Sequence, residues 1–243
     1  IAFVILCAAG SAAGYFYIER SAGDGSKKTD FVVKNGWGAS AVTSGLYRES
    51  LIRSRTAFKI MLFLTGKNSE MKRGIYSLNN SMKPPQIIDI LTSGRTKTVT
   101  FTIPEGFNNR QIADELVKKG LFVSKDRFIK LASSPAILSK FGITGSSVEG
   151  YLFPDTYTIP VGYPEEKIIA LMVEHFFEKT SELNGFPAEP KNRQRLVILA
   201  SIVEREAKVV NERPIIAAVF INRLKKDMPL ESCATIQYLF DPP

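Results

Sequence analysis

The sequence is poor in the residues that support redox and metal chemistry. It has two cysteines, one histidine and one tryptophan among 243 residues. Cys7 lies in an apolar run and Cys233 is the only thiol in the rest of the chain, so no disulfide is expected there. His175 has apolar neighbours, which argues against a histidine-based triad or a zinc cluster. These shortages predict a body held by its hydrophobic core, with no metal site and no cofactor.

Charge is missing from the first eighteen residues, Ile1 to Ile18. As a helix they would extend about 27 Å at about 1.5 Å per residue, close to the thickness of the bilayer core. Tyr15, Phe16 and Tyr17 close the run as an aromatic belt would. We expect an uncleaved transmembrane helix at residues 1–18, followed by a polar linker at 19–30. The alternatives are a cleaved signal peptide or a lipoprotein signal, although Leu6 is large for the residue before a lipoprotein Cys.

Charge is distributed unevenly along the remaining sequence. Residues 31–100 hold eleven Lys or Arg against three Asp or Glu, and this +8 equals the formal net charge of the whole chain. Such a segment suits an anionic surface: phospholipid headgroups, a cell-wall polymer or nucleic acid. Export beyond the membrane makes nucleic acid an unsuitable partner. A basic face that is merely solvated is the simpler alternative.

Two stretches of the chain repeat each other at a spacing of 70. Each predicts a short strand, a glycine turn and an amphipathic helix, with a second helix starting near Arg53 or Lys125. In the second stretch Asn108 or Asn109 offers the helix cap and Gly120 the stop. The matched apolar or glycine positions are Phe31, Val33, Gly36, Trp37, Val42, Leu46, Leu51 and Phe58 with Phe101, Ile103, Gly106, Phe107, Ile112, Leu116, Leu121 and Phe128. If the spacing between the copies increases by six residues further along the chain, Arg73 aligns with Glu149. The first copy would then be a basic binding or docking module, and the second copy would carry the chemistry.

One carboxylate stands in an apolar and aromatic frame, Val148-Glu149-Gly150-Tyr151-Leu152-Phe153-Pro154-Asp155-Thr156-Tyr157. A carboxyl group against rings and aliphatic side chains loses hydration of its charged form, so it can carry a proton at neutral pH. That property suits a general acid that protonates a glycosidic oxygen. The alternative is a buried strand that ends in a turn, with Glu149 at its wet edge.

The last third of the chain predicts two apolar helices. Leu196, Leu199, Ala200, Val203 and Ala207 recur at helical spacing, so residues 193–208 should form one helix with a buried face. Glu204 and Glu206, two apart on it, cannot both face one cleft. Asn211 can cap a second helix over residues 215–224. A turn and a polar strand or helix start follow at residues 229–238.

Four segments together resemble the YceG-like endolytic murein transglycosylases, also called the MltG family. They are Ile103-Pro104-Glu105-Gly106, the Glu149–Tyr157 motif, residues 200–207, and Val219-Phe220-Ile221-Asn222-Arg223-Leu224. The resemblance implies a single-pass protein of the bacterial cytoplasmic membrane, with its catalytic part outside the cytoplasm. It implies an α+β fold class: an N-terminal transmembrane helix, a small LysM-like module at residues 31–100, and a mixed α+β catalytic domain at residues 101–243 that is truncated at its C-terminus.

The resemblance also implies site residues and a reaction. Glu149 matches the catalytic Glu, and the positions expected to line the cleft are Tyr151, Asp155, Tyr157, Glu204, Asn222, Ser232, Thr235, Gln237 and Tyr238. Many relatives have Asp-Pro where Cys233-Ala234 stands, which puts the local contact there in question. The implied reaction cleaves nascent peptidoglycan strands between N-acetylmuramic acid and N-acetylglucosamine and leaves 1,6-anhydro ends. Peptidoglycan strands and peptidoglycan synthases are the expected partners.

Two other function classes fit parts of the same sequence. A two-carboxylate muramidase would pair Glu149 with Asp155 or Glu204 and leave reducing ends. A noncatalytic wall-binding scaffold would keep the basic segment and would not need Glu149. The masses of the products distinguish a muramidase from a lytic transglycosylase. Substitution of Glu149 distinguishes a noncatalytic scaffold from an enzyme.

Overall fold

The computed structural model describes residues 19–238 and 240. These residues form a mixed α+β structure with two antiparallel ribbons of two strands each, β1–β2 and β3–β4. By backbone contacts, one unit comprises the described residues up to 99 together with 158–162. The other comprises residues 100–157 and those from 163 onward. The domain limits expected from the sequence stay a prediction.

The expected fold class needs one correction, which concerns the transmembrane helix. Across residues 19–238 and 240, no helix combines the length and the apolar character needed to cross a membrane. The two longest, α8 and α9, have 17 residues each. The expected span at residues 1–18 lies outside the described residues. Across the described residues, the fold class that the structure supports is therefore mixed α+β, with no membrane-spanning helix among them.

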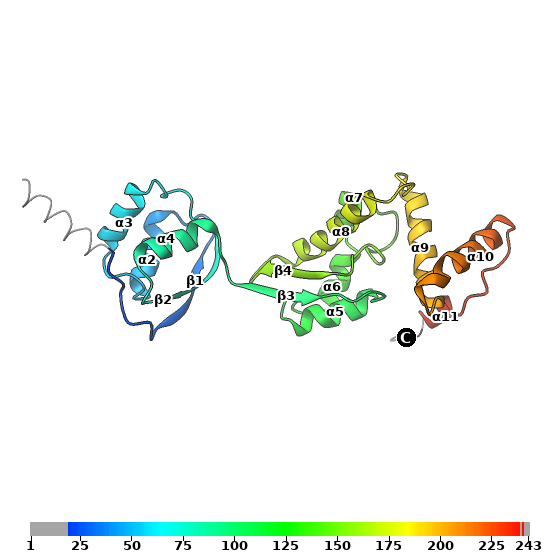
Figure 1. Ribbon diagram of the computed structural model, residues 1–243, viewed down its shortest axis with the longest axis horizontal. Helices are drawn as coiled ribbons and strands as arrows, with labels where there is room; N and C mark the ends of the chain where they lie inside the picture. The colour runs from blue at the N-terminus through cyan, green and yellow to red at the C-terminus, as the bar shows by residue number, and fades with distance from the viewer. Residues whose placement is uncertain (1–18, 239, 241–243) are drawn as a thin grey trace, which may run out of the picture. The chain divides into compact units, whose positions relative to one another are not determined.

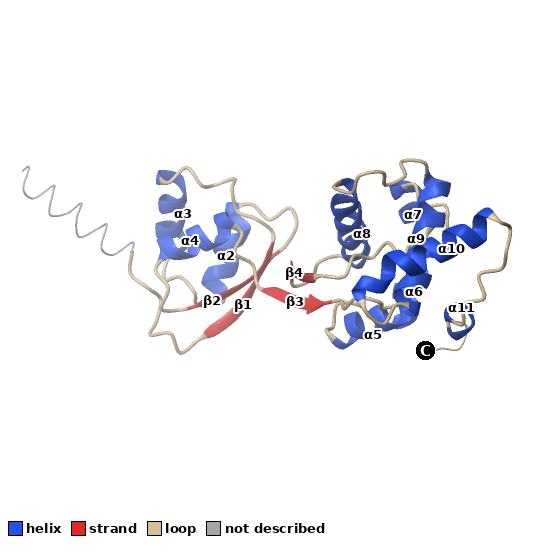
Figure 2. Cartoon of the chain, turned by 45° about the vertical axis from the view of Figure 1, so that its right-hand side comes forward, coloured by secondary structure: helices blue, strands red, loops and turns tan. Residues whose placement is uncertain are grey.

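The first unit packs three helices on one side of the β1–β2 ribbon (Figures 1 and 2). Phe31 and Val33 of β1, with Tyr76 and Leu78 of β2, are buried, while Val32 between them is exposed. Alternate residues of a strand point to opposite faces, so the buried set marks the helix-covered face. The elements are β1 (Lys28–Val33), α2 (Ala39–Arg48), α3 (Arg55–Leu64), β2 (Gly74–Asn79) and α4 (Pro84–Ser93).

From β3 onward, the chain repeats this order of elements and adds others to it. After β3 (Thr98–Thr102) come α5 (Asn109–Lys118) and α6 (Lys125–Ala132), which start 70 residues after α2 and α3 respectively. Ser54 and Ser124 cap the matched second helices through their hydroxyls. The predicted repeat therefore extends to helix boundaries and caps. The remaining elements are α7 (Pro135–Phe141), β4 (Thr156–Pro160), α8 (Glu165–Ser181), α9 (Pro190–Glu206), a short helix η1 (Val210–Glu212), α10 (Arg213–Lys225) and α11 (Ala234–Gln237).

The second strands of the two copies show that the expected drift of six residues is wrong. Val33 pairs with Gly74, whereas its counterpart Ile103 donates its N–H to the carbonyl of Asp155. The spacing has thus grown from 70 to 81, and α8 likewise starts 81 residues after α4. The counterpart of Gly74 is Asp155, so Arg73 does not correspond to Glu149. The second copy is eleven residues longer in the connection that contains α7 and Glu149.

A pair of tyrosines supports the corrected alignment. Tyr76 pairs across the ribbon with Phe31, and Tyr157, 81 residues later, stacks on Phe101 with ring centroids 5.3 Å apart. Each tyrosine hydroxyl donates to the carbonyl oxygen four residues before it, at 2.6 Å in both cases. Burial raises the pKa of both hydroxyls, and for Tyr157 the Asp155 charge adds to the effect. In both copies, a buried tyrosine of the second strand therefore hydrogen-bonds to the segment just before that strand.

The C-terminal helices differ in part from the expectation. α9 is one helix as predicted, but its buried residues are Ile202 and Val203, which pack with Phe220 of α10. Leu196, expected on the buried face, is 40% exposed. α10 begins at Arg213 with Pro214 in its first turn, and Asn211 lies in the preceding short helix instead of capping it.

Candidate functional site

Glu149 lies in a tight turn between α7 and β4, where the alternative expectation placed a strand. Val148 is fully buried and donates its N–H to the carbonyl of Ala132, and the N–H of Tyr151 closes the turn onto Val148. Gly150 has a φ of 81°, in the left-handed region. A Cβ there would lie 2.6 Å from Cγ1 of Val197, so space as well as conformation requires glycine. The Glu149 backbone is therefore fixed from both sides.

The carboxylate of Glu149 faces the start of α5. The backbone N–H of Asn109, the first residue of that helix, donates to Oε2 of Glu149 at 3.3 Å. The N-terminus of a helix carries partial positive charge, so Glu149 stands at a place where its side chain interacts with the exposed N–H groups of α5. The side chain is partly buried, which leaves one side open to a ligand.

Two polar side chains support this turn. The hydroxyl of Ser147 accepts from the N–H of Glu149 at 3.3 Å and from Nδ2 of Asn109 at 3.4 Å. Asn109 is only 6% exposed, and its Oδ1 is buried without a hydrogen-bond partner among the described atoms. Asn109 thus binds the Glu149 loop through both its backbone and its side chain.

Glu204, which lies on α9, stands next to the turn that precedes α5. Its carboxyl carbon lies 4.0 Å from the position that a Cβ of Gly106 would take. Gly106, with a φ of 76°, forms the turn that leads into α5. Glu149 and Glu204 therefore lie at the two ends of the segment 106–109. Glu206 points elsewhere and accepts a hydrogen bond from Ser232 at 2.5 Å, as expected for two carboxylates that cannot share one cleft.

One face of α9 holds the Glu149 loop in place. Arg193 donates to the carbonyl of Gly142 at 2.7 Å, Gln194 contacts the hydroxyl of Thr144 at 3.2 Å, and Val197 packs on Gly150. Val197 and Glu204 are seven residues apart, so they lie on the same side of the helix. α9 therefore bridges the loop and the segment 106–109.

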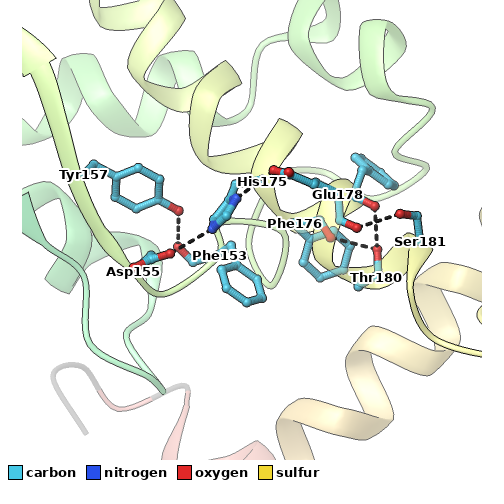
Figure 3. A network of polar contacts seen from close by, with 9 residues as sticks. Phe153, Asp155, Tyr157, His175, Phe176, Glu178, Thr180 and Ser181 are labelled. Atoms are coloured by element: carbon cyan, nitrogen blue, oxygen red, sulfur yellow. Dashed lines mark hydrogen bonds and ion pairs between the residues drawn. The ribbon is translucent and has the colours of Figure 1, made fainter.

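Asp155 belongs to a second group, centred on His175 of α8 (Figure 3). Nε2 of His175 lies 2.8 Å from Oδ2 of Asp155, and Nδ1 lies 3.1 Å from Oε2 of Glu178. Burial alone would lower the pKa of His175, but the hydrogen bonds and charges of Glu178 and Asp155 raise it. The N–H of Thr156 and then His175 hold the pKa of Asp155 below its usual value. Asp155 fixes the strand start to α8 and makes no bond to Glu149.

Tyr151 and Tyr157 are buried, at 1% and 7% exposed. Tyr151 packs edge-on against Phe176, and its pKa is raised by burial, with the nearby Arg193 charge opposing. In this conformation neither ring offers a face to a saccharide. Their role in substrate binding stays a prediction, and their visible role is packing under the Glu149–Tyr157 motif.

The remaining predicted positions gather near the C-terminal helices. Ser232, partly buried, bonds to Glu206, and the hydroxyl of Thr235 donates to the carbonyl of Ser232 at 3.0 Å. Asn222 on α10, Gln237 and Tyr238 are exposed. Arg223 instead shapes this region, because it donates to the carbonyls of Pro229 and Leu230 and pairs with Glu231 at 2.7 Å. The structure thus separates the predicted site residues into three groups.

Four residues of these groups were missed by sequence reasoning: Asn109 and Ser147 beside Glu149, Arg193 on α9, and His175 beside Asp155. From the sequence, Asn109 is expected only as a helix cap. The apolar neighbours of His175 in the sequence argue against a polar role for it. The usable signal was its place on the helix that follows the Asp155 motif. In the described part of the chain, no group of three or more His, Cys, Asp or Glu side chains is arranged to hold a metal ion.

A shallow pocket of about 180 Å³ lies beside the site instead of at Glu149. It is lined by Phe177, Phe186, Arg193 and neighbouring residues of the α8–α9 connection. The guanidinium of Arg193 stacks on the Phe177 ring at 4.8 Å, which closes one wall. None of the predicted site residues lines this pocket.

Comparison with known proteins adds three findings. A family model described as the YceG-like family matches residues 31–242. An endolytic murein transglycosylase of Bacillus subtilis is 31% identical over 236 residues, which cover 88% of this chain and 64% of that protein. One of Streptococcus pneumoniae is 29% identical over 270 residues, covering 98% of this chain and 48% of that protein. The chain therefore spans about half to two thirds of the length of these curated relatives.

A solved structure agrees with the fold. The crystal structure of a YceG-like protein from Listeria monocytogenes superposes with a TM-score of 0.52 and 25% identity, covering 89% of this chain and 76% of that one.

Proposed function

The chain belongs to the YceG-like family, and on this premise we propose that it is a lytic transglycosylase that cuts murein glycan strands internally, with Glu149 as its single acid and base. The observation that carries the proposal is the placement of Glu149. A partly buried carboxylate is fixed on a Gly150 turn and faces the start of α5. The names of the relatives, endolytic murein transglycosylase, supply the substrate class.

One carboxylate suffices for this reaction because no water needs activation. Protonated Glu149 gives its proton to the oxygen that links C1 of N-acetylmuramic acid to N-acetylglucosamine, and the C1–O bond breaks. The resulting carboxylate then takes the proton of the muramyl C6 hydroxyl. That oxygen bonds to C1 and closes a 1,6-anhydro ring. Glu149 is protonated again at the end of the cycle, and no water is consumed.

Neighbouring residues have defined tasks in this scheme. The N–H of Asn109 stabilises the carboxylate between the two proton transfers. Ser147 holds the Glu149 backbone and Asn109 together. Glu204, at the other end of the segment 106–109, supplies negative charge near the cationic sugar that forms when the C1–O bond breaks.

We further propose that the protein acts at the outer side of the bacterial cytoplasmic membrane, where nascent strands are polymerised, close to peptidoglycan synthases. Residues 31–100 serve there as a LysM-like glycan-binding module. The βααβ order of that unit and its positive charge support this assignment. Cell fractionation and co-purification with synthases test the location and the partnership.

The decisive experiment is the mass of the muropeptides released from purified murein by the full-length protein. Anhydro ends are lighter by one water than the reducing ends that a two-carboxylate muramidase leaves. Glu149→Gln should lower the rate by about a hundredfold to ten-thousandfold, because both proton transfers are lost. Glu182→Gln, a change at an exposed carboxylate after α8, is the matched control and should leave the rate unchanged.

Three results would contradict the proposal in different ways. Reducing ends would establish hydrolysis by a two-carboxylate mechanism. Cutting that persists in Glu149→Gln would remove Glu149 from the chemistry. Murein binding without any cutting by the wild-type protein would favour the noncatalytic scaffold.

A further inference from the structure

The solvent face of α3 is apolar although nothing in the described structure covers it. Ile60, Phe63 and Leu64 are 45%, 74% and 75% exposed. At about 100° per residue these three positions fall on one side of the helix. The opposite side, with Phe58, Met61 and Leu62, is already buried in the core. Clustered exposure of large apolar side chains marks interaction sites on proteins.

The second copy of the fold shows that these side chains are not needed for packing. The spacing of 70 places Lys130, Ser133 and Ser134 at the positions of Ile60, Phe63 and Leu64. Those residues lie near and just after the end of α6, which caps and packs like α3. The second copy therefore folds with polar residues at all three positions, two of which lie beyond the end of its helix. The apolar face of α3 therefore requires an explanation other than folding.

Lysines lie beside this apolar face. Lys59 is exposed and adjoins Ile60 on the helix, and Lys67 follows shortly after the helix ends. Arg53 and Arg55 stand at its beginning, and Glu70 is the nearest acid in sequence on the C-terminal side. The surrounding segment, residues 31–100, carries a net charge of +8. Large apolar side chains beside lysines are typical of helices that lie in the interface of an anionic membrane.

We propose that Lys59, Ile60, Phe63, Leu64 and Lys67 form a membrane-docking face that binds an anionic phospholipid surface. Phe63 and Leu64 enter the boundary between headgroups and acyl chains, while the two lysines bind the lipid phosphates. Murein could meet the positive charge through the carboxylates of its stem peptides, but it offers no apolar phase for the exposed Ile60, Phe63 and Leu64. The inference rests on α3 and not on the proposed activity.

A tryptophan scan of the full chain tests the docking face directly. All variants carry Trp37→Phe, which removes the only native tryptophan, so that one introduced residue reports its own surroundings. Phe63→Trp is compared with Ser133→Trp, its counterpart in the second copy, and with Val32→Trp, on the ribbon face away from the helices. Emission is recorded with phosphatidylcholine vesicles and with vesicles that also contain phosphatidylglycerol, each with and without brominated acyl chains.

We expect the indole introduced by Phe63→Trp to shift its emission to the blue and to lose most of it to brominated chains, only when phosphatidylglycerol is present. The indoles introduced by Ser133→Trp and Val32→Trp should stay unquenched. Replacing both lysines by glutamine should weaken docking by about fivefold for each charge removed. Adding Ile60→Lys and Leu64→Ser, which introduce the residues of the second copy, should abolish the quenching in the Phe63→Trp protein.

Other outcomes would overturn the inference. Equal quenching at positions 63, 133 and 32 would mean that no particular face docks. Quenching in phosphatidylcholine alone would remove the role of the lysines. A blue shift without vesicles that grows with protein concentration would identify a second copy of the chain as the occupant. Loss of murein cutting has no bearing on these readouts, so the two proposals fail separately.

Discussion

At the scale of single residues, the site depends on a glycine as much as on a carboxylate. Gly150 lets the chain turn at a φ of 81° and gives Val197 room to approach, so that α9 can press on the loop. The contact between Gly150 and Val197 helps to orient the neighbouring Glu149. Its position is therefore set by packing against α9 as well as by its own hydrogen bonds.

Gly150→Ala should destabilise the protein by at least about 2 kcal/mol, since it combines a left-handed conformation with a clash against Val197. Gly120→Ala is the matched control: its φ is 68°, but nothing lies within 4 Å of the added methyl group. It should cost about 1 kcal/mol. Urea unfolding measures both variants, and equal costs would show that Val197 exerts no steric constraint on the turn.

The contacts among Asp155, His175 and Glu178 predict how the stability of the folded protein changes with pH. The pKa of His175 is raised in the folded protein, so its stabilising contribution is fully present below the unfolded value of about 6.5. The contribution is lost as the pH rises through the folded pKa. The pKa of Asp155 is lowered, so Asp155 is ionised throughout this window and loses its contribution only as the pH falls below about 3.8.

His175→Asn should accordingly destabilise the protein more at about pH 6 than at about pH 9. Unfolding by urea at the two pH values, with wild type alongside, measures the difference. Lys179 is the basic group that also acts on Asp155 and is unchanged in both proteins. A destabilisation that is the same at both pH values would show that His175 acts only by packing against the rings of Phe153 and Tyr157.

At the scale of elements, α5 carries the site because its first residue touches Glu149. Asn108 caps this helix by accepting from the N–H groups of Arg110 and Gln111 at 3.0 and 2.9 Å. Ser124 caps α6 in a similar way but touches no site residue. Substituting each cap can therefore show whether an effect comes from the stability of a helix or from the position of the Asn109 N–H.

Asn108→Ala and Ser124→Ala should each cost about 1 kcal/mol of stability. Only Asn108→Ala should also slow the proposed cleavage, because a frayed start of α5 no longer holds the N–H of Asn109 against Glu149. Rates on purified murein, with unfolding curves for both variants, measure the two effects. Equal rates in the two variants would place the Asn109 contact outside the reaction.

The elements also show how far sequence reasoning reaches. The apolar pattern and caps predicted the starts of α3, α5 and α6 because these depend on residues close in sequence, such as Asn108 and Lys125. The register of the second strand was missed because it depends on the length of a loop, which leaves no periodic signal. Likewise, the motif around Glu149 marks it as a candidate in the sequence, whereas His175 and Asn109 reach their partners only through packing of distant segments.

At the scale of the whole molecule, two copies of one frame have different surroundings and charges. Leu46 and Leu116 occupy equivalent positions, 70 residues apart, and both are fully buried. Each lies in a different compact unit. The matched pair can therefore report how strongly the units depend on each other for stability.

Leu46→Ala and Leu116→Ala should each cost about 2–5 kcal/mol in the unit that contains the change. Amide hydrogen exchange should show faster exchange in residues 28–93 for the first variant and in residues 101–157 for the second. Faster exchange in both ranges for either variant would mean that the chain unfolds as one cooperative block.

The eleven-residue difference between the copies has an evolutionary consequence. The longer connection that holds Glu149 leaves the strands and helices around it in the same order as in the copy that lacks it. A loop of this kind can gain, change or lose chemistry through insertions and deletions while selection on folding stays nearly constant. Descendants of such a duplicated ancestor could thus diverge into enzymes and inert adaptors by altering one helix-to-strand segment.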